Sequence, residues 1–304
     1  MNILLIAGGW SPERQVSLVG AQKIREALQL LGHSVTVFDP ETSLQGLCEA
    51  AKDKDFAFIN LHGAPGEDGV VQAMLTRIGV PYQGSAPAGS FLALHKDAAK
   101  SLFRKFGLHT PDWILLHELP APDWSPPFPY PIFIKNNTGG SSLGLAMVTC
   151  AEELHPALQR LFAKGGDFLM EPACKGREVT CGVLGEEPLP PILIVPKAQG
   201  GKFFDYESKY VAGAADEICP APLPEETLNR IKTAALKAHF ALGLSGYSRA
   251  DFILGDDGSL NLLEVNTLPG MTPNSLVPRE ASAKGLYFEQ LIQRLIDLGR
   301  AAGK

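Results

Sequence analysis

A hairpin near the carboxyl end of the chain constrains its folding most, because its turn decides which side chains face one another. Asp257-Gly258 is a strong hairpin signal, and apolar, extended sequence flanks it on both sides. If this dipeptide is the centre of the turn, Asp251 lies opposite Glu264, and Arg249 lies opposite Asn266. The period of two along a strand then places all four side chains on one face of the sheet.

Two carboxylates that face each other at about 5 Å repel, and apolar neighbours crowd this pair. A hard cation such as Mg²⁺ would offset the repulsion. It would take oxygen ligands from Asp251, Glu264 and the amide of Asn266, and keep further positions for phosphate oxygens. A solvated hairpin with surface charges is the alternative, and it needs no metal.

Charge and composition exclude two classes of partner. The 304 residues carry a net charge of -6, with 45% hydrophobic and 20% charged residues, which is ordinary for a globular protein of more than one compact unit. Nucleic acids and membrane surfaces are bound through clustered Lys and Arg. We therefore expect neither as a partner, and any bound phosphate must be held by a few local groups or by a metal.

Cysteine usage and the amino terminus both indicate a cytoplasmic protein. The 5 cysteines are odd in number and form no CxxC pair, as expected of free thiols in a reducing compartment. The apolar run MNILLIAGG is too short and lacks the basic start of a signal peptide, and no run approaches membrane-spanning length.

The first 80 or so residues alternate apolar strands with helices, which predicts a parallel sheet with helices on both faces. The predicted strands are 2–7, 35–38 and 56–61. Ligands gather at the carboxyl ends of such strands, which selects the loops 8–17 and 62–69. A Rossmann dehydrogenase would fit this alternation, but the GxGxxG spacing after the first strand is missing.

A Pro-rich connection at 120–131 is followed by a second set of elements. We predict strands at 132–135, 145–148, 168–171, 179–184 and 191–195, and helices at 152–162, 225–242 and 287–299. The polar, Gly-rich segment 197–213 has no predicted element, and a stretch of that length is usually functional or disordered.

Two loops in this second part have the residue types of a nucleotide site. Lys135 ends a strand and precedes a Gly/Ser loop, 136–144, whose backbone amides can face an anion, although no P-loop motif occurs. Glu171 and Glu178 stand at the two ends of EPACKGRE, where carboxylates can accept from a base or a ribose. Taken singly, a mobile hairpin tip explains the first loop nearly as well, and two solvated loop acids explain the second better than a nucleotide contact does.

Five motifs in order make the chain similar to one family. GGWSPERQVSL, LHGAPGEDG, KNNTGGSSLG, FFDYESKY and the segment from RADF through LLEVNTLPGMT to SLVP resemble the D-alanine–D-alanine ligases of the ATP-grasp superfamily. The resemblance implies an α/β, three-domain ATP-grasp fold, with a Rossmann-like parallel-sheet domain at 1–95 and α+β domains at 96–178 and 179–304 that clamp ATP.

The resemblance also implies a role for each matching residue. Nucleotide contacts fall on Lys96, Lys135, Ser141, Ser142, Glu171, Glu178, Lys209 and Asn266, and metal ligands on Asp251, Glu264 and Asn266. The substrate and catalytic groups are Glu13 and His62 for the first D-alanine, Arg249 and the Gly270 amide for the oxyanion, Ser275 and Leu276 for the second D-alanine, and the trio Glu13, Ser141 and Tyr210.

The activity that the family implies is ATP-dependent ligation of two D-alanines through a D-alanyl phosphate, for peptidoglycan synthesis. Its cofactors would be ATP and two Mg²⁺ or Mn²⁺ ions, with K⁺ as an activator, and its assembly a homodimer. A D-alanine–D-lactate or other D-amino-acid ligase is the alternative, although Tyr210 favours an amine as nucleophile. A nonenzymatic nucleotide-binding protein would be expected to lose part of the hairpin set, and this chain keeps all of it.

Three positions depart from the family pattern. Trp10 replaces a smaller polar residue, His95 precedes Lys96 where an acid is frequent, and Arg279-Glu280 replaces small apolar residues. We expect the charged pair to affect the outer wall of the second subsite and Trp10 to alter loop packing.

Overall fold

The computed structural model describes residues 1–140, 144–197 and 215–303. Its amino-terminal part contains a parallel sheet in the order β2-β1-β3. These strands are β1 (Asn2–Ala7), β2 (Ser34–Phe38) and β3 (Phe56–Asn60). All but the first residue of β1 are buried, as expected for a continuous apolar strand covered on both faces. The predicted parallel sheet is confirmed.

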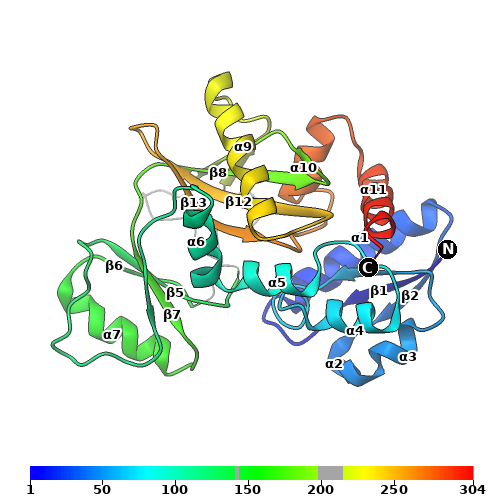
Figure 1. Cartoon of the computed structure of the whole chain (residues 1–304), viewed down its shortest axis with the longest axis horizontal. Coiled ribbons are helices and arrows are strands. Elements are labelled where there is room, and N and C mark those ends of the chain that lie inside the picture. The colour runs from blue at the N-terminus through cyan, green and yellow to red at the C-terminus, as the bar shows by residue number, and fades with distance from the viewer. Residues whose placement is uncertain (141–143, 198–214, 304) are drawn as a thin grey trace.

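Helices cover this sheet and connect its strands. They are α1 (Arg14–Leu30), the short α2 (Pro40–Ser43) and α3 (Leu47–Ala51), and α4 (Val70–Ile78). The carboxyl-terminal helix α11 (Phe288–Ala301) packs against α1, so the two ends of the chain lie close together (Figure 1). Leu291 and Leu295 of α11 are completely buried in the core of this sheet.

A second, antiparallel sheet has the order β4-β7-β5-β6. Its strands are β4 (Ile114–Leu116), β5 (Ile132–Asn136), β6 (Ala146–Val148) and β7 (Phe168–Pro172). Ile134 and Met170 pack with the helix α7 (Ala151–Phe162) on one face. Because side chains alternate, Lys135 and Glu171 lie on the opposite face.

The third sheet has six strands, with the path β11-β10-β8-β12-β13 and β9 paired to β8. Its strands are β8 (Arg177–Leu184), β9 (Glu187–Pro188), β10 (Ile192–Pro196), β11 (Ala215–Ile218), β12 (Tyr247–Leu254) and β13 (Leu260–Asn266). Helix α9 (Glu225–Ala241) packs on one face (Figure 1). The other face carries the charged residues of the hairpin.

The β12–β13 hairpin has the predicted pairs but not the predicted turn. Asp251 lies opposite Glu264, and Arg249 lies opposite Asn266, as expected. Nearer the tip, Leu254 pairs with Leu260, which is one residue out of that register.

A β-bulge accounts for the difference. The register shifts between Asp251 and Phe252, where Leu263 has no partner of its own. The tip is a loop from Gly255 to Ser259, closed by a 2.8 Å bond from the Gly255 amide to the Ser259 carbonyl. A turn centred on Asp257-Gly258 was therefore wrong, and the bulge restores the predicted pairing at the charged end.

Three helices were not predicted: α5 (Pro87–Leu94), α6 (Lys96–Lys105) and α10 (Leu276–Ala283). In α6, the buried residues include Lys96 and Lys100 as well as Ala99 and Phe103. Two lysines on the buried face conceal the apolar pattern by which an amphipathic helix is identified. The apolar side chains of α6 pack in the core of the third sheet, although the helix precedes the second sheet in sequence.

None of the helices in the described part of the chain has the length and apolar character needed to cross a bilayer.

Candidate functional site

The loop after β1 is fixed by ionic and hydrogen-bonded contacts. Asp39 accepts from the Gly9 amide at 2.9 Å and from Arg14 at 2.6 Å, and Arg14 also donates to the Gly9 carbonyl at 2.8 Å. A Cβ atom at Gly8, where φ is +92°, would lie 2.5 Å from the Asp39 carboxylate. Only glycine fits this turn, and the turn delivers Glu13 to the start of α1.

Glu13 and His62, the two residues predicted to hold the first substrate, lie close enough to interact electrostatically. Both are buried. Burial lowers the pKa of His62, Glu13 acts against that effect, and Arg249 adds to it. The hairpin of the third sheet is therefore also close to this ring.

Glu67 is a third charged group in this corner that the sequence analysis did not single out, although it lies in the motif LHGAPGEDG. Its carboxylate accepts from the Gly63 amide at 2.7 Å. Burial and the nearby Glu13 raise the pKa of Glu67 to about 7. Glu67 therefore titrates near neutrality beside the predicted first-substrate position.

On the hairpin, the charges compensate one another within the two strands. Arg249 donates twice to Asp251, from Nε and from a guanidinium nitrogen, both at 2.8 Å. The Asn266 amide nitrogen donates to the same carboxylate at 3.0 Å, and the Thr180 hydroxyl of β8 donates at 2.7 Å. The Asp251 carboxylate, together with nearby acids, raises the pKa of Arg249 despite burial.

Lys96 offsets the second acid of the hairpin. Its ammonium lies 3.3 Å from Glu264 and donates to the Gly139 carbonyl at 2.5 Å. The start of α6 thus joins the hairpin to the glycine loop. A metal ion is consequently not required to offset the repulsion between the two facing acids, although that repulsion was the reason to predict a metal from the sequence.

The hairpin nevertheless fits a hard divalent cation by the chemistry of its donors. Asp251, Glu264 and Asn266 present two carboxylates and an amide on one face, all oxygen donors of the kind that Mg²⁺ takes. No group of three or more acidic, His or Cys side chains forms a cation site among the residues that the structure describes. Phosphate oxygens or water would have to complete the coordination.

The second sheet contributes a buried cluster of three charges. Glu171 accepts from Lys135 at 2.6 Å and from Lys100 at 2.7 Å. Burial favours the neutral acid, but the two lysines outweigh it and lower the pKa of Glu171. Lys100 was missed by the sequence analysis, because nothing in the sequence indicates that a lysine in the middle of α6 faces a strand residue.

Glu178 lies on β8, two residues from Thr180 and on the same face of the sheet as Asp251. Of the two acids predicted to contact the base and the ribose, Glu171 thus lies on the face of the second sheet opposite α7, and Glu178 on the hairpin-charge face of the third sheet. A Cβ atom at Gly140 would lie 3.1 Å from the Glu13 carboxylate. The glycine loop therefore reaches the first-substrate corner.

The segment after β13 turns back on itself at the predicted second-substrate position. The Ser275 hydroxyl accepts from the Thr272 amide at 3.0 Å and lies 2.8 Å from the Thr272 hydroxyl. Ser275 is the residue that precedes α10, and Leu276 is the first residue of that helix. Gly270 lies against this turn, since a Cβ atom there would be 3.2 Å from the Ser275 hydroxyl.

Four predicted residues lie outside the described part of the chain: Ser141, Ser142, Lys209 and Tyr210. Among the described residues, contacts and charge interactions join the loops after β1 and β3, the start of α6, Lys135 with Glu171, and the hairpin set from Arg249 to Asn266.

Two of the three departures from the family pattern lie at the surface. Trp10 is 51% exposed, and His95 stacks on Phe91 with ring centroids 3.9 Å apart. Within the third, Arg279 pairs with Glu217 at 3.1 Å. Glu280 is completely buried, with both carboxylate oxygens 3.0 Å from the Gly182 amide. Glu280 is thus buried against β8, on the face of the sheet that carries Arg249, and its effect on the outer wall of the second subsite stays a prediction.

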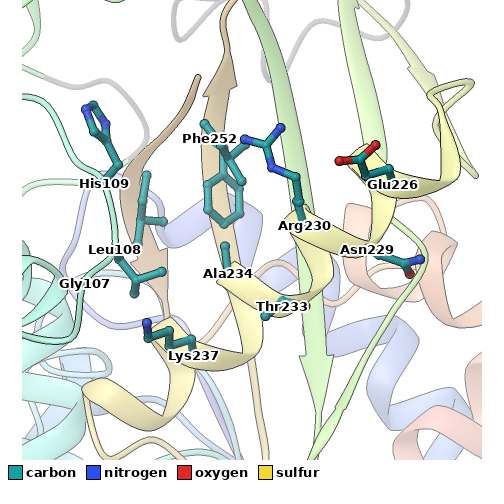
Figure 2. A pocket seen from close by; sticks show the side chains of 12 residues that line it. Gly107, Leu108, His109, Glu226, Asn229, Arg230, Thr233, Ala234, Lys237 and Phe252 are labelled. Carbon is teal, nitrogen blue, oxygen red and sulfur yellow. The ribbon is translucent and has the colours of Figure 1, made fainter. Parts of the chain in front are cut away.

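A cavity of about 520 Å³ lies on the other face of the third sheet (Figure 2). Arg230 and Lys237 of α9 line it together with His109 and the buried Phe252. Phe252 alternates with Asp251, so this cavity and the predicted site are on opposite faces. No predicted site residue lines it.

Comparisons with known proteins agree with the motifs. A family model described as the carboxyl-terminal part of D-ala D-ala ligase matches residues 102–297. The chain is 62% identical to a D-alanine–D-alanine ligase of Oleidesulfovibrio alaskensis over 99% of this chain and 97% of that protein. It is 63% identical to the ligase of Nitratidesulfovibrio vulgaris over 99% of both.

Solved structures give the same result. The D-alanine–D-alanine ligase of Bacillus anthracis complexed with ATP matches with a TM-score of 0.87 and 32% identity, over 100% of this chain and 98% of that one. The VanG D-Ala:D-Ser ligase of Enterococcus faecalis matches with a TM-score of 0.83 and 28% identity, over 98% and 99%.

Proposed function

This chain belongs to the D-alanine–D-alanine ligase family, whose ATP-dependent reaction joins two D-alanines for peptidoglycan synthesis, and we propose that the charged groups between its sheets perform the ligation through an acyl phosphate. The ATP-grasp fold is shared with the ATP-complexed relative. The observation that carries the proposal is the hairpin, where Arg249, Asp251, Glu264 and Asn266 face the same space.

We assign the nucleotide to the space between the second and third sheets. Lys96 and Lys135 would bind its phosphates, because the Lys96 ammonium contacts the glycine loop, Lys135 lies just before that loop, and acids hold both ammonium groups in place. Glu171 would accept from the adenine amino group and Glu178 from the ribose. Ser141, Ser142 and Lys209 are proposed as further phosphate contacts on the family pattern alone.

Asp251, Glu264 and Asn266 would hold the divalent ions, Mg²⁺ or Mn²⁺, and two ions are proposed. Bound there, the metal would neutralise phosphate charge. The donor set supports this assignment, since the Glu264 side chain is 25% exposed and lies 3.3 Å from the Lys96 ammonium, next to the space assigned to the phosphates. K⁺ activation and a homodimer are proposed from the family. A cytoplasmic location is proposed from the need for ATP and from the free cysteines.

The first D-alanine is assigned to the corner formed by the loops after β1 and β3. Glu13 would accept its ammonium, and His62 would lie near its carboxylate. A carboxylate oxygen of this substrate attacks the terminal phosphorus of ATP, the bond from phosphorus to the bridging oxygen breaks, and ADP leaves. Lys135 and Lys96 offset the repulsion between the two anions, which is the main obstacle to this step.

The second D-alanine is assigned to the turn before α10, where Ser275 and Leu276 would receive its carboxylate. Its neutral amine attacks the carbonyl of the acyl phosphate, and inorganic phosphate leaves from the tetrahedral intermediate. Arg249 and the Gly270 amide would stabilise the oxyanion. Glu13, Ser141 and Tyr210 are proposed to close the site and exclude water, which would hydrolyse the acyl phosphate.

We propose the domain division 1–95, 96–178 and 179–304. The strands of each sheet support it, except that β8 begins at Arg177. In packing, α6 belongs with the third sheet and α11 with the first.

The choice of second substrate is tested by supplying ATP and Mg²⁺ with D-alanine alone, with L-alanine, and with D-alanine plus D-lactate or D-serine. D-alanine alone should release phosphate and yield the dipeptide, whereas L-alanine should not. A product with D-lactate or D-serine that exceeds the dipeptide would favour the alternative ligases. This comparison is needed because a D-Ala:D-Ser ligase has the same fold.

A further inference from the structure

Glu171 is held by two lysines that differ in their freedom to leave. Its Oε1 accepts from Lys135 at 2.6 Å, and its Oε2 accepts from Lys100 at 2.7 Å. The side chain of Lys135 is 14% exposed, whereas that of Lys100 is 0% exposed. The two oxygens of the acid are thus covered by one accessible cation and one enclosed cation.

The surroundings of Lys100 fix it in place. Its ammonium lies 5.3 Å from the centre of the Trp113 ring, and the Arg104 guanidinium lies 4.3 Å from the same ring. Burial lowers the pKa of Lys100 to about 8, Glu171 acts against this, and Lys135 adds to it. Lys100 therefore depends on Glu171 for its charge and has no exposed route away from it.

The Lys135 ammonium can contact a second group besides Glu171. Lys135 is the last but one residue of β5, close to the glycine loop, and Glu171 and Glu264 raise its pKa despite burial. It thus remains a cation between the buried acid and the hairpin. An ammonium in this position can turn towards phosphate groups without entering an apolar environment.

Resting on the nucleotide site proposed above, we propose that Lys135 is a movable cap, which covers Oε1 of Glu171 and can leave it, and that Lys100 is the fixed counter-ion of Glu171. The phosphates of the nucleotide draw Lys135 away, Oε1 becomes available to the amino group of adenine, and Lys100 keeps the buried carboxylate compensated. The phosphate end of the ligand thereby controls recognition of its base.

The physical reason is the cost of leaving a buried carboxylate without a cation. With Lys100 on Oε2, Glu171 can release Lys135 and still be paired. A nucleoside without phosphates offers the Lys135 ammonium no new partner. Its adenine amino group must therefore compete with that ammonium for Oε1 of Glu171. The two ends of the nucleotide are therefore coupled in binding free energy.

The first experiment measures the dissociation constants of adenosine and ADP by calorimetry for the wild-type protein and for Lys135→Met. Removal of the cap should tighten adenosine binding by about 5-fold or more, the lower range of such couplings, and weaken ADP binding. Opposite shifts for two ligands of one site cannot come from misfolding. Adenosine affinity that is unchanged or lower in Lys135→Met would overturn the proposal.

The second experiment tests the fixed counter-ion with Lys100→Met. Lys135 is then the only cation on Glu171, so ADP binding should weaken at least about 5-fold. Lys105→Met is the matched control, because Lys105 ends the same helix and is exposed. Unchanged ADP affinity in Lys100→Met would remove Lys100 from the mechanism, and the Lys135→Met experiment decides the proposal if this variant does not fold.

Glu171→Gln separates failure of this proposal from failure of the site assignment. Inosine has an oxygen where adenosine has the amino group, so the preference for adenosine over inosine should fall in Glu171→Gln. If that preference stays at the wild-type value, the assigned base contact is wrong. If it falls while Lys135→Met fails to tighten adenosine, the contact stands and the movable cap is wrong.

Discussion

Two buried acids of the site, Asp251 and Glu171, are compensated in different ways. On the hairpin, Asp251 is paired with Arg249, two residues away on the same strand. In the second sheet, Glu171 is paired with lysines that are 36 and 71 residues distant in sequence, on β5 and α6. The first pair is a property of one strand, whereas the second cluster exists only after three elements have packed.

The difference has a consequence for what each acid can do. Among the described residues, Asp251 forms an ion pair with Arg249 alone, so loss of the Arg249 side chain leaves the Asp251 carboxylate without a cation. Glu171 has two, and one can leave. An acid with one cation is therefore expected to stay fixed, whereas an acid with two cations can release one of them and remain compensated.

Removal of the hairpin charge at Glu264 should have the largest effect. Glu264→Gln keeps the shape of the side chain but removes the negative charge that we assign to metal-nucleotide binding. Metal contributions of several kcal/mol correspond to a loss of turnover of roughly 1000-fold. Steady-state kinetics at saturating ATP measures it.

Asp256→Asn is the control for this variant, because Asp256 is an exposed acid at the tip of the same hairpin. It should leave turnover unchanged. The melting temperature of Glu264→Gln should also stay near the wild-type value, because the Glu264 side chain is 25% exposed and the glutamine amide keeps its size and its hydrogen-bonding capacity. Near-normal turnover of Glu264→Gln would show that the metal site is misplaced.

Arg249→Met tests the comparison directly. Asp251 would remain buried without a cation, which should lower the free energy of unfolding by about 3 kcal/mol, and loss of an oxyanion donor should lower turnover about 100-fold. Lys135→Met should cost only about 1 kcal/mol, because Glu171 keeps Lys100. Urea denaturation of both variants measures the contrast.

The double variant Arg249→Met with Asp251→Asn should regain much of the stability and none of the activity. Equal stability losses in Arg249→Met and Lys135→Met would contradict the distinction between a single and a shared counter-ion.

The same distinction explains what could be predicted from the sequence. Strand periodicity and one turn gave the pairs Asp251–Glu264 and Arg249–Asn266, because both pairs are local. Even there, the prediction succeeded through a bulge at Leu263 that no sequence rule placed. The strands of the first sheet were likewise predicted from continuous apolar runs.

Contacts made between elements were not predictable in this way. Lys100 meets Glu171 only because α6 lies between the second and third sheets, and its position depends on Phe103 and Ala99 packing under the third sheet. The family resemblance supplied roles for Lys135 and Glu171 but none for Lys100. No local pattern indicates which lysine of a helix is buried against a distant acid.

Glu280 is a further buried acid, and a backbone amide rather than a lysine or arginine donates to it. Both of its oxygens lie 3.0 Å from the Gly182 amide, and a Cβ atom at Gly182 would be 2.4 Å from Oε2. Gly182→Ala should therefore lower the free energy of unfolding by about 2 kcal/mol through overpacking. Gly46→Ala is a matched control, since its nearest contact would be 3.5 Å away.

Thermal and urea denaturation measure this effect. Combining Gly182→Ala with Glu280→Ala should relieve the overlap, so the two substitutions should not be additive. Additive losses would mean that the close approach of Glu280 to β8 is not what requires glycine there.

Glu67 gives the smallest effect and the sharpest contrast with Glu171, because burial and the nearby Glu13 outweigh the effect of Lys96 on its carboxyl group, whereas two lysines dominate at Glu171. Its pKa is raised to about 7 in the folded protein, against an ordinary value of 4.5 that we take for the unfolded chain. The folded state thus binds more protons between these values. The stability that Glu67 contributes is fully present below pH 4.5 and is lost as the pH rises through 7.

Glu67→Gln should remove this pH dependence. The difference in unfolding free energy between pH 5 and pH 8 should shrink by about 1 kcal/mol relative to the wild type, a value reduced because Glu67 is partly exposed. Urea denaturation at the two pH values measures it, and Asp68→Asn serves as the neighbouring control. If Glu67→Gln keeps the wild-type pH dependence, burial and Glu13 do not raise the pKa of Glu67 in the folded protein.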